Sequence, residues 1–213
     1  RGAHLYLEAR AAANRIRFPF DARPLELGLR DTLSWCRSGE DDVPAAPGDS
    51  HRAIFIIGPL RSGTSLLDQV FSRHPAIAGG GELKHLWLAT RELGDCSSSG
   101  IGGYLRSQAG LQPPESTWTE FRRRYLALAD ERFGTACRFT DKLLSNVYRI
   151  RAIRAALPDA AILSIQRDPV DVAWSCWRAQ FDAESAWANS PESIALYLAC
   201  HRRMMEAWKS RYP

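Results

Sequence analysis

The stretch Ala53–Ser65, AIFIIGPLRSGTS, decides the fold of this chain of 213 residues. It opens with a short, continuous apolar run rich in β-branched side chains, which is the pattern of a buried parallel strand. Gly58 closes the run and begins a tight loop. From Thr64 to Arg73 the apolar side chains recur at helical spacing, and a His-Pro pair then ends the segment. Strand, glycine loop and helix together predict a nucleotide-binding βα unit.

The loop 58–65 is suited to hold a phosphate. Its glycines let the backbone turn close to an anion, and the following helix points its free N–H groups and the positive end of its dipole at that anion. The loop has the outer spacing of a Walker A motif, but Thr64 stands where that motif requires a lysine. Arg61 can supply positive charge instead, which suits a donor with one 5′-phosphate and a sulfuryl group better than a nucleoside triphosphate with magnesium. The alternative is a strand, turn and helix that bind nothing.

The remainder of the chain alternates between helical and strand patterns. Helices are predicted over 4–17, 25–36, 83–93, 119–132 and 145–156, strands over 136–140 and 160–166, and a loop over 94–103. Pro169 begins one more helix, as proline does at a first helical position. This alternation predicts a parallel sheet with ligands at the carboxyl ends of its strands. The predicted fold class is therefore α/β, a P-loop NTPase-like three-layer fold with a central parallel sheet, preceded by a short helical segment.

Composition divides the chain into three parts. Residues 1–37 form a helical N-terminal segment, and residues 38–51 form a linker that collects Gly, Pro, Asp and Ser. Residues 52–213 form the main domain. Because the sequence opens within a helical pattern and stops directly after another helix, we expect a piece of a longer protein whose main domain is incomplete at its C-terminal end.

A second motif, Gln166–Ser175, follows the last predicted strand. Arg167 leaves the end of that strand, and Ser175 lies on the next helix about 9 Å of rise beyond Pro169. The arginine can clamp a further phosphate by a charge-assisted fork, and the serine can do so by its hydroxyl. The alternative is that Arg167 and Asp168 form a capping ion pair.

With both motifs in hand, the chain resembles the sulfotransferase superfamily, and within it the tyrosylprotein-sulfotransferase-like and bacterial tetratricopeptide-linked branch. The matching residues occur in the family's order at plausible spacing over about residues 50 to 213: Phe55–Gln69, Ser72–Pro75 with Gly81–Leu83, Thr140–Lys142 with Asn146, Arg167–Pro169 with Asp171 and Ser175, and the tail Tyr197–Trp208. The resemblance implies transfer of a sulfuryl group from 3′-phosphoadenosine-5′-phosphosulfate (PAPS) to an acceptor hydroxyl, leaving 3′-phosphoadenosine-5′-phosphate (PAP). Residues 1–37 are then a candidate for the end of a tetratricopeptide array.

The resemblance also implies a role for each matched site residue. The 5′-phosphosulfate is held by Arg61, Ser62, Gly63, Thr64 and Ser65, and the 3′-phosphate by Arg167 and Ser175. Glu82 falls on the general-base glutamate, and a carboxylate within hydrogen-bond reach can take the proton that the acceptor hydroxyl loses. Lys142 matches the lysine beside the transferring group, where it and Arg61 would stabilise developing negative charge. No metal is needed, because these cations replace magnesium.

Several single residues keep a second interpretation. Glu82 can be a carboxylate that favours the dipole of a helix N-terminus, and Lys142 a solvated lysine at a strand end. His85 either assists proton transfer or is a partly buried histidine on a helix face, and the second is favoured. Trp174 and Trp177 are expected in the core rather than stacked on a base.

The family pattern is broken at one point. It usually has a proline two residues after the lysine, whereas here Leu143 and Leu144 follow Lys142. Arg122–Arg124 is most simply a solvated helix face, with binding of an acidic acceptor as the alternative.

Composition bounds the compartment and the partners. The chain is 45% hydrophobic and 24% charged, which is ordinary for a soluble globular protein. No apolar run approaches the roughly 20 residues of a membrane span, and the N-terminus lacks the order of a signal peptide. The net charge of +4 is spread along the sequence, so no nucleic-acid partner is expected, and the five cysteines have no CxxC spacing that would indicate zinc or a disulfide framework. We expect a bacterial cytoplasmic enzyme acting on a protein tyrosine, a carbohydrate or a small molecule, with its oligomeric state open.

Two rival functions remain. The first is a nucleotide kinase or NTPase with a degenerate P-loop, against which the missing Walker lysine argues. The second is a non-catalytic relative that binds a nucleotide or a partner protein without turnover.

Overall fold

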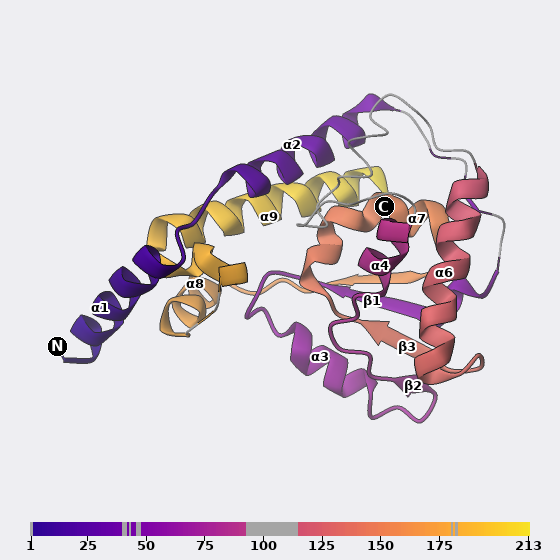
Figure 1. Cartoon of the computed structure of the whole chain (residues 1–213), viewed down its shortest axis with the longest axis horizontal. Coiled ribbons are helices and arrows are strands. Elements are labelled where there is room, and N and C mark those ends of the chain that lie inside the picture. The colour runs from indigo at the N-terminus through magenta and orange to yellow at the C-terminus, as the bar shows by residue number, and fades with distance from the viewer. Residues whose placement is uncertain are drawn as a thin grey trace.

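Among the residues that the structure describes, four parallel strands form the central sheet in the order β2-β3-β1-β4 (Figure 1). The computed structural model describes residues 2–39, 42, 44–45, 48–92, 115–179, 181 and 183–213. The strands are β1 (Ala53–Ile57), β2 (Ile77–Ala78), β3 (Arg138–Asp141) and β4 (Ala161–Ser164). Strand β1 is buried at all five positions and pairs with β3 on one side and β4 on the other. A continuous apolar run is what a strand covered on both faces requires.

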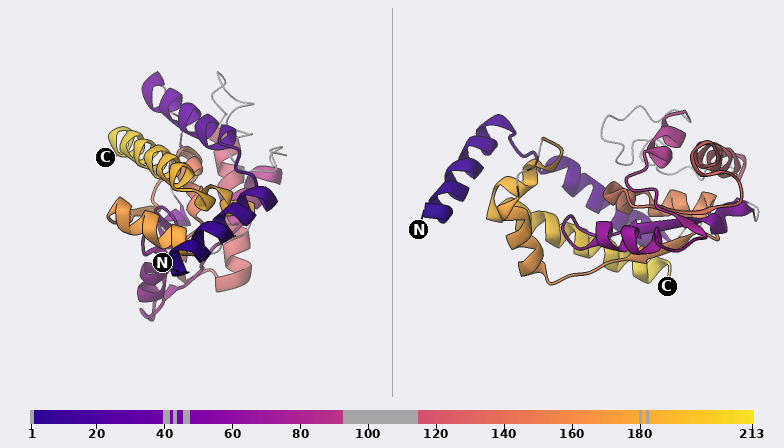
Figure 2. Two further views of the ribbon diagram at one scale, coloured as in Figure 1. Left: turned by 90° about the vertical axis from the view of Figure 1, so that its left-hand side faces the viewer. Right: turned by 90° about the horizontal axis from the view of Figure 1, so that it is seen from below.

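The helices cover both faces of this sheet, so the predicted α/β class is confirmed. They are α1 (Gly2–Arg17), α2 (Arg23–Ser38), α3 (Thr64–Phe71), α4 (His85–Glu92), α6 (Glu115–Phe133), α7 (Ile150–Ala156), α8 (Pro169–Arg178) and α9 (Pro191–Arg211), with short 3-10 helices η1 (Asp49–Arg52), η2 (Leu144–Arg149) and η3 (Ala183–Asn189). Seen from below, α4 and α6 lie on one side of the strands and α9 lies on the other (Figure 2).

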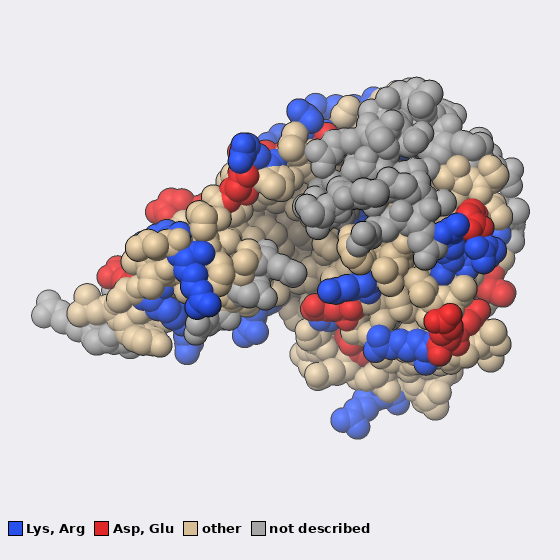
Figure 3. Space-filling model, viewed as in Figure 1, with Lys and Arg blue, Asp and Glu red and all other residues tan. Residues whose placement is uncertain are grey.

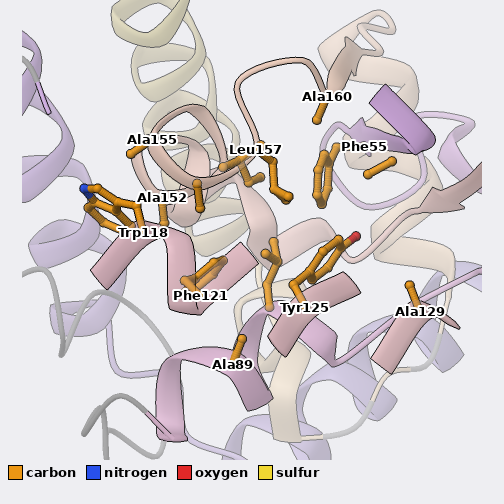
Figure 4. Packing of buried hydrophobic residues seen from close by; sticks show 14 of the residues in the cluster. Phe55, Ala89, Trp118, Phe121, Tyr125, Ala129, Ala152, Ala155, Leu157 and Ala160 are labelled. Carbon is orange, nitrogen blue, oxygen red and sulfur yellow. The ribbon is translucent and has the colours of Figure 1, made fainter. Parts of the chain in front are cut away.

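An aromatic core fills the face under α4, α6 and α7. Tyr125 of α6 is fully buried, with its ring centroid 5.8 Å from that of Phe55 and 6.1 Å from that of Phe139. Trp118 and Phe121, on the same helix, are also fully buried (Figure 4). Because these side chains come from β1, β3 and α6, their burial fixes the helix against the sheet.

A second core joins the N-terminal helices to the other face. Leu25 and Leu29 of α2 pack in one cluster with Met204 and Trp208 of α9. The Trp208 indole donates a hydrogen bond to the carbonyl oxygen of Val147 at 2.9 Å, which ties α9 to η2. Helix α2 therefore shares its apolar face with the domain that begins at β1.

Helix α1 is attached through polar contacts. The Arg10 guanidinium donates to the carbonyl oxygens of Trp177, Arg178 and Ala179 at 2.8, 3.2 and 2.9 Å. These carbonyls lie at the C-terminal end of α8, where backbone acceptors lack partners within the helix. Arg10 thus caps the C-terminal end of α8, although it lies more than 160 residues away in the sequence.

Several sequence predictions need correction. The helix predicted over 145–156 is a 3-10 helix followed by α7, and the predicted strands 136–140 and 160–166 are the shorter β3 and β4. Strand β2 was not predicted, and the loop predicted over 94–103 lies outside the described residues. Trp174 was expected in the core, but it is 54% exposed, with the Arg178 guanidinium 5.9 Å from its ring centroid. Trp177 does pack against the cluster formed by α8, η3 and α9.

We predict that Asp42→Ala lowers the free energy of unfolding by about 3 to 5 kcal/mol, because it leaves the Arg151 guanidinium buried without its carboxylate. The two side chains form a bidentate pair at 2.7 Å and are only 4% and 7% exposed. Denaturant titration would measure the change. The matched control is Asp21→Ala, which breaks an exposed pair with Arg23 and is expected to cost much less than Asp42→Ala, because exposed ion pairs contribute little to stability; equal losses in the two variants would contradict the prediction.

Candidate functional site

The loop after β1 has the geometry of an anion cradle. Gly58 is required at its start, because a Cβ there would lie 2.8 Å from Ser62 Oγ and 3.0 Å from the carbonyl oxygen of Ile165. Arg61 and Gly63 both have left-handed backbone conformations, with φ of 68° and 106°. Left-handed residues interspersed in a loop turn backbone N–H groups toward a common concave side, where an anion can bind. A non-glycine residue with positive φ costs about 1 kcal/mol or more, so Arg61 stores backbone strain in this loop.

The hydroxyl residues of the loop differ in exposure. Ser62 and Thr64 are 6% and 4% exposed, whereas Ser65 is exposed. Ser62 Oγ is buried and finds no hydrogen-bond partner among the described residues. A buried hydroxyl without a partner is unusual in a native structure. Its presence in the cradle is consistent with a ligand that brings an acceptor.

Arg61, Ser175 and Arg167 come together beside the cradle. Arg61 Nε donates to Ser175 Oγ at 3.0 Å, and Arg167 Nη1 donates to the carbonyl oxygen of Arg61 at 3.3 Å. Asp168 caps α8 by accepting from the N–H groups of Val170 and Asp171 at 2.8 and 3.2 Å. The structure therefore separates the two residues of the suggested capping ion pair: Asp168 is the cap, whereas Arg167 bonds the backbone of the cradle and pairs with Asp171 of α8 at 3.5 Å.

Glu82 and Lys142 form an ion pair at the neighbouring strands. Lys142 Nζ lies 2.6 Å from Glu82 Oε1, and the lysine side chain is 9% exposed while the glutamate side chain is 56% exposed. The interpretation of Lys142 as a solvated lysine is therefore wrong. Glu82 lies three residues before α4 and contacts the lysine through its carboxylate. A carboxylate open to solvent and a shielded ammonium in contact can act together on a hydroxyl and an anion.

Two glycines bring this pair together. Gly80 N donates to Thr140 Oγ1 at 2.9 Å, and Lys142 N donates to the carbonyl oxygen of Gly81 at 2.8 Å. A Cβ at position 80 would overlap the carbonyl oxygen of Thr140, and Gly81 has a φ of 65°. The Thr140 hydroxyl also bonds the carboxylate of Asp68, on the helix that follows the cradle. Residues 79–82 are thereby fastened along β3.

Sheet order then places all four loops at one edge. The loops follow β2, β3, β1 and β4, and they carry Glu82, Lys142, Arg61 and Arg167 respectively. Neighbouring strands lie about 4.8 Å apart, so the four side chains start from adjacent positions. The predicted site residues from distant parts of the sequence are thus found at the carboxyl edge of one parallel sheet.

A buried carboxylate next to the ion pair was matched in the sequence, within Thr140–Lys142, but was given no role there. Asp141, the last residue of β3, is fully buried, and burial raises the pKa of its carboxyl to about 7. It accepts a hydrogen bond from the hydroxyl of Tyr125, which lies in a different helix. His85 is 9% exposed and lies edge-on to the same tyrosine ring, and its pKa is lowered by burial. His85 is therefore a buried helix residue, as the favoured interpretation held.

On the face shown in Figure 3, lysine and arginine side chains are interspersed with aspartate and glutamate side chains, and they form no dominant basic patch. Within the described ranges, no three His, Cys, Asp or Glu side chains are grouped so that they could hold a metal ion. No helix among the described residues has the length and apolarity needed to cross a membrane.

Comparison with known proteins adds an independent finding. The family model described as "Sulfotransferase family" matches residues 53–213. An uncharacterized protein of Aquifex aeolicus (strain VF5) is 28% identical over 181 residues, a match that covers 77% of this chain and 22% of that protein. The chain therefore spans about a fifth of the length of this relative.

We predict that Gly80→Ala lowers the free energy of unfolding by more than about 2 kcal/mol, because the added methyl group forces residues 79–82 away from β3. Gly39→Ala is the control: Gly39 has a positive φ of 71°, which Gly80 does not, but it faces open space, so only the conformational cost of about 1 kcal/mol is expected. Denaturant unfolding of both variants measures the difference. A smaller loss at position 80 than at position 39 would show that the close approach does not constrain the loop.

Proposed function

The chain belongs to the sulfotransferase family over residues 53–213, and on that premise we propose that it transfers a sulfuryl group from PAPS to an acceptor hydroxyl. The observation that carries the proposal is the arrangement at the carboxyl edge of the sheet. A left-handed loop at a helix N-terminus, with Arg61 and Arg167 beside it, adjoins a carboxylate already in contact with an ammonium. Such a site offers separate groups for an anionic donor and for a hydroxyl acceptor.

The donor would be held by the cradle and its arginines. The backbone of residues 61–65 and the hydroxyls of Ser62, Thr64 and Ser65 would bind the 5′-phosphosulfate. Arg167 and Ser175 would bind the 3′-phosphate, the arginine by charge-assisted bonds. Arg61 already donates to Ser175, so it links the two phosphate sites and is placed to take part in both.

Transfer would proceed by in-line displacement. The acceptor oxygen attacks sulfur, the bond from sulfur to the 5′-phosphate oxygen breaks, and PAP leaves. Glu82 would accept the proton of the attacking hydroxyl, since its carboxylate is open to solvent. Lys142 and Arg61 would stabilise the negative charge that develops on the sulfuryl and leaving oxygens. If a sulfuryl oxygen of the donor replaced Glu82 Oε1 as the hydrogen-bond acceptor of Lys142 Nζ, Glu82 Oε1 would be free to bind the acceptor hydroxyl.

The acceptor class stays a prediction of the sequence: a protein tyrosine, a carbohydrate or a small molecule. Residues 94–135 carry no sequence pattern that indicates the acceptor, and part of this range lies outside the described residues. The tetratricopeptide-linked branch and a bacterial cytoplasmic location are likewise predictions. Transfer of labelled sulfate from PAPS to a panel of a tyrosine peptide, an oligosaccharide and a phenol would assign the acceptor class.

We predict that PAP binds at least 10-fold more tightly than AMP in calorimetric titration, because the 3′-phosphate adds charge-assisted hydrogen bonds worth about 1.5 to 3 kcal/mol. Arg167→Ala should abolish that margin. The control variant Arg178→Ala removes one positive charge from an exposed position at the other end of α8, and it should keep the margin. Tighter binding of ATP with magnesium than of PAP would instead support a kinase or NTPase.

We predict that Glu82→Gln lowers the rate of sulfuryl transfer at least 100-fold, because an amide cannot accept the hydroxyl proton. The affinity for PAP should change by less than about 2-fold, since Glu82 is not assigned to the donor site. Rates with the acceptor selected by the panel, measured beside PAP titrations, test both points. Tight PAP binding by a wild-type chain that transfers nothing to any acceptor would support a non-catalytic relative.

A further inference from the structure

Asp141 is a buried carboxylate that bonds the hydroxyl of Tyr125, and it stands immediately before Lys142 in the sequence. It is the last residue of β3 and has no exposed surface. Burying a carboxylate is costly unless its oxygens are hydrogen-bonded, so its contacts indicate what the group does. The role assigned to Glu82 and Lys142 does not account for it.

The contacts of Asp141 lead to the chain just beyond Lys142. Oδ1 accepts from Leu143 N at 3.3 Å and from Asn146 Nδ2 at 3.0 Å, and Oδ2 accepts from the Tyr125 hydroxyl at 3.1 Å. Leu143 is the N-cap residue of η2, and Asn146 lies within that helix. One carboxylate thus joins the end of β3, the start of η2 and the buried face of α6.

Lys142 is held from both sides as a result. Successive residues of a strand point to opposite faces, so Asp141 faces α6 while Lys142 faces the loop that carries Glu82. On that second face, Lys142 N donates to the carbonyl oxygen of Gly81. Asp141 supplies the complementary restraint by fixing the direction in which the chain leaves the strand.

We infer that Asp141 is a positioning residue for Lys142, whose carboxylate holds the turn after β3 so that the lysine ammonium stays against Glu82. The inference rests on the proposed function for its meaning in the reaction. Its structural content, the dependence of Lys142 on Asp141, stands without that function.

The ionisation of Asp141 makes its restraint on the turn dependent on pH. Burial raises its pKa to about 7, while the bonds from Leu143 N, Tyr125 and Asn146 and the charge of Arg149 in η2 act in the opposite direction. Two further titratable groups among the described residues are Lys142, next in the sequence, and His85 of α4, which lies edge-on to Tyr125. Because hydrogen bonds to an ionised carboxylate are about twice as strong as neutral ones, the turn is held more firmly above pH 7 than below it.

The chain contains only three lysines, Lys84, Lys142 and Lys209, so lysine labelling can observe the position directly. With [13Cε]lysine incorporated, Lys142→Arg assigns the Lys142 signal in a carbon NMR spectrum. We expect that signal to shift between pH 6 and 8 with a midpoint near 7, and to lose this titration in Asp141→Asn. A wild-type signal that is flat over this range, or one that titrates unchanged in Asp141→Asn, would overturn the inference.

Two further variants and one control keep the test decisive. Tyr125→Phe removes a bond that lowers the pKa of Asp141, so the midpoint should move upward, and this holds even if Asp141→Asn does not fold. Tyr148→Phe makes the same change at a half-buried tyrosine packed against the α2–α9 core and should leave the midpoint in place. Loss of the titration in His85→Gln would assign it to the histidine and refute the role of Asp141.

Kinetics then separate this inference from the proposed function. With PAPS and an acceptor, Asp141→Asn should lower kcat at least 10-fold and leave the donor KM within 2-fold, because Lys142 is displaced while the cradle is intact. An unchanged kcat would overturn the positioning role. The NMR measurement needs neither donor nor acceptor, so a chain that transfers no sulfuryl group would still decide whether Asp141 controls Lys142.

Discussion

The burial of β1 on both faces is the constraint on which the rest of the structure depends. Its five residues allow no polar side chain, so every group of the candidate site must follow the strand or come from a neighbour. Gly58 makes the exit possible, because only a residue without a Cβ leaves room for Ser62 and for the backbone after β4. Parallel pairing with β3 and β4 then brings the loops that carry Lys142 and Arg167 to the same edge.

The end of β3 shows how a parallel strand can present one cation accurately. Thr140 reaches Asp68 and the backbone of Gly80 on one face, while Asp141 reaches Tyr125 on the other. The helices α3 and α6, on the two sides of the sheet, are therefore both connected to the two residues that precede Lys142. A displacement of either helix would move the ammonium, which makes the packing of α6 part of the catalytic arrangement that we propose.

Sequence predicted the parts of this molecule whose cause is local. An apolar run followed by a glycine loop predicts β1 and the cradle, and a proline at the first helical position predicts the start of α8. Strand β2 was not predicted because two residues are too few to show an alternating pattern. It forms because β3 lies beside it. Trp174 was wrongly predicted to lie in the core. Helical spacing shows which residues share a face of α8, but it does not show whether another element covers that face. Asp141 was matched within Thr140–Lys142 but given no role, because its partner Tyr125 lies sixteen residues earlier, in a helix that only the folded chain brings to β3.

The packing of α2 on α9 has a consequence for the order in which the protein folds during synthesis. The Trp35 indole bonds the hydroxyl of Tyr212 across 177 positions of the chain. At translation rates of about 5 to 20 residues per second, α2 waits about 10 to 35 s for the segment that covers its apolar face. During that interval the apolar face of α2 lacks its partner in α9, so it is open to chaperones and to other nascent chains.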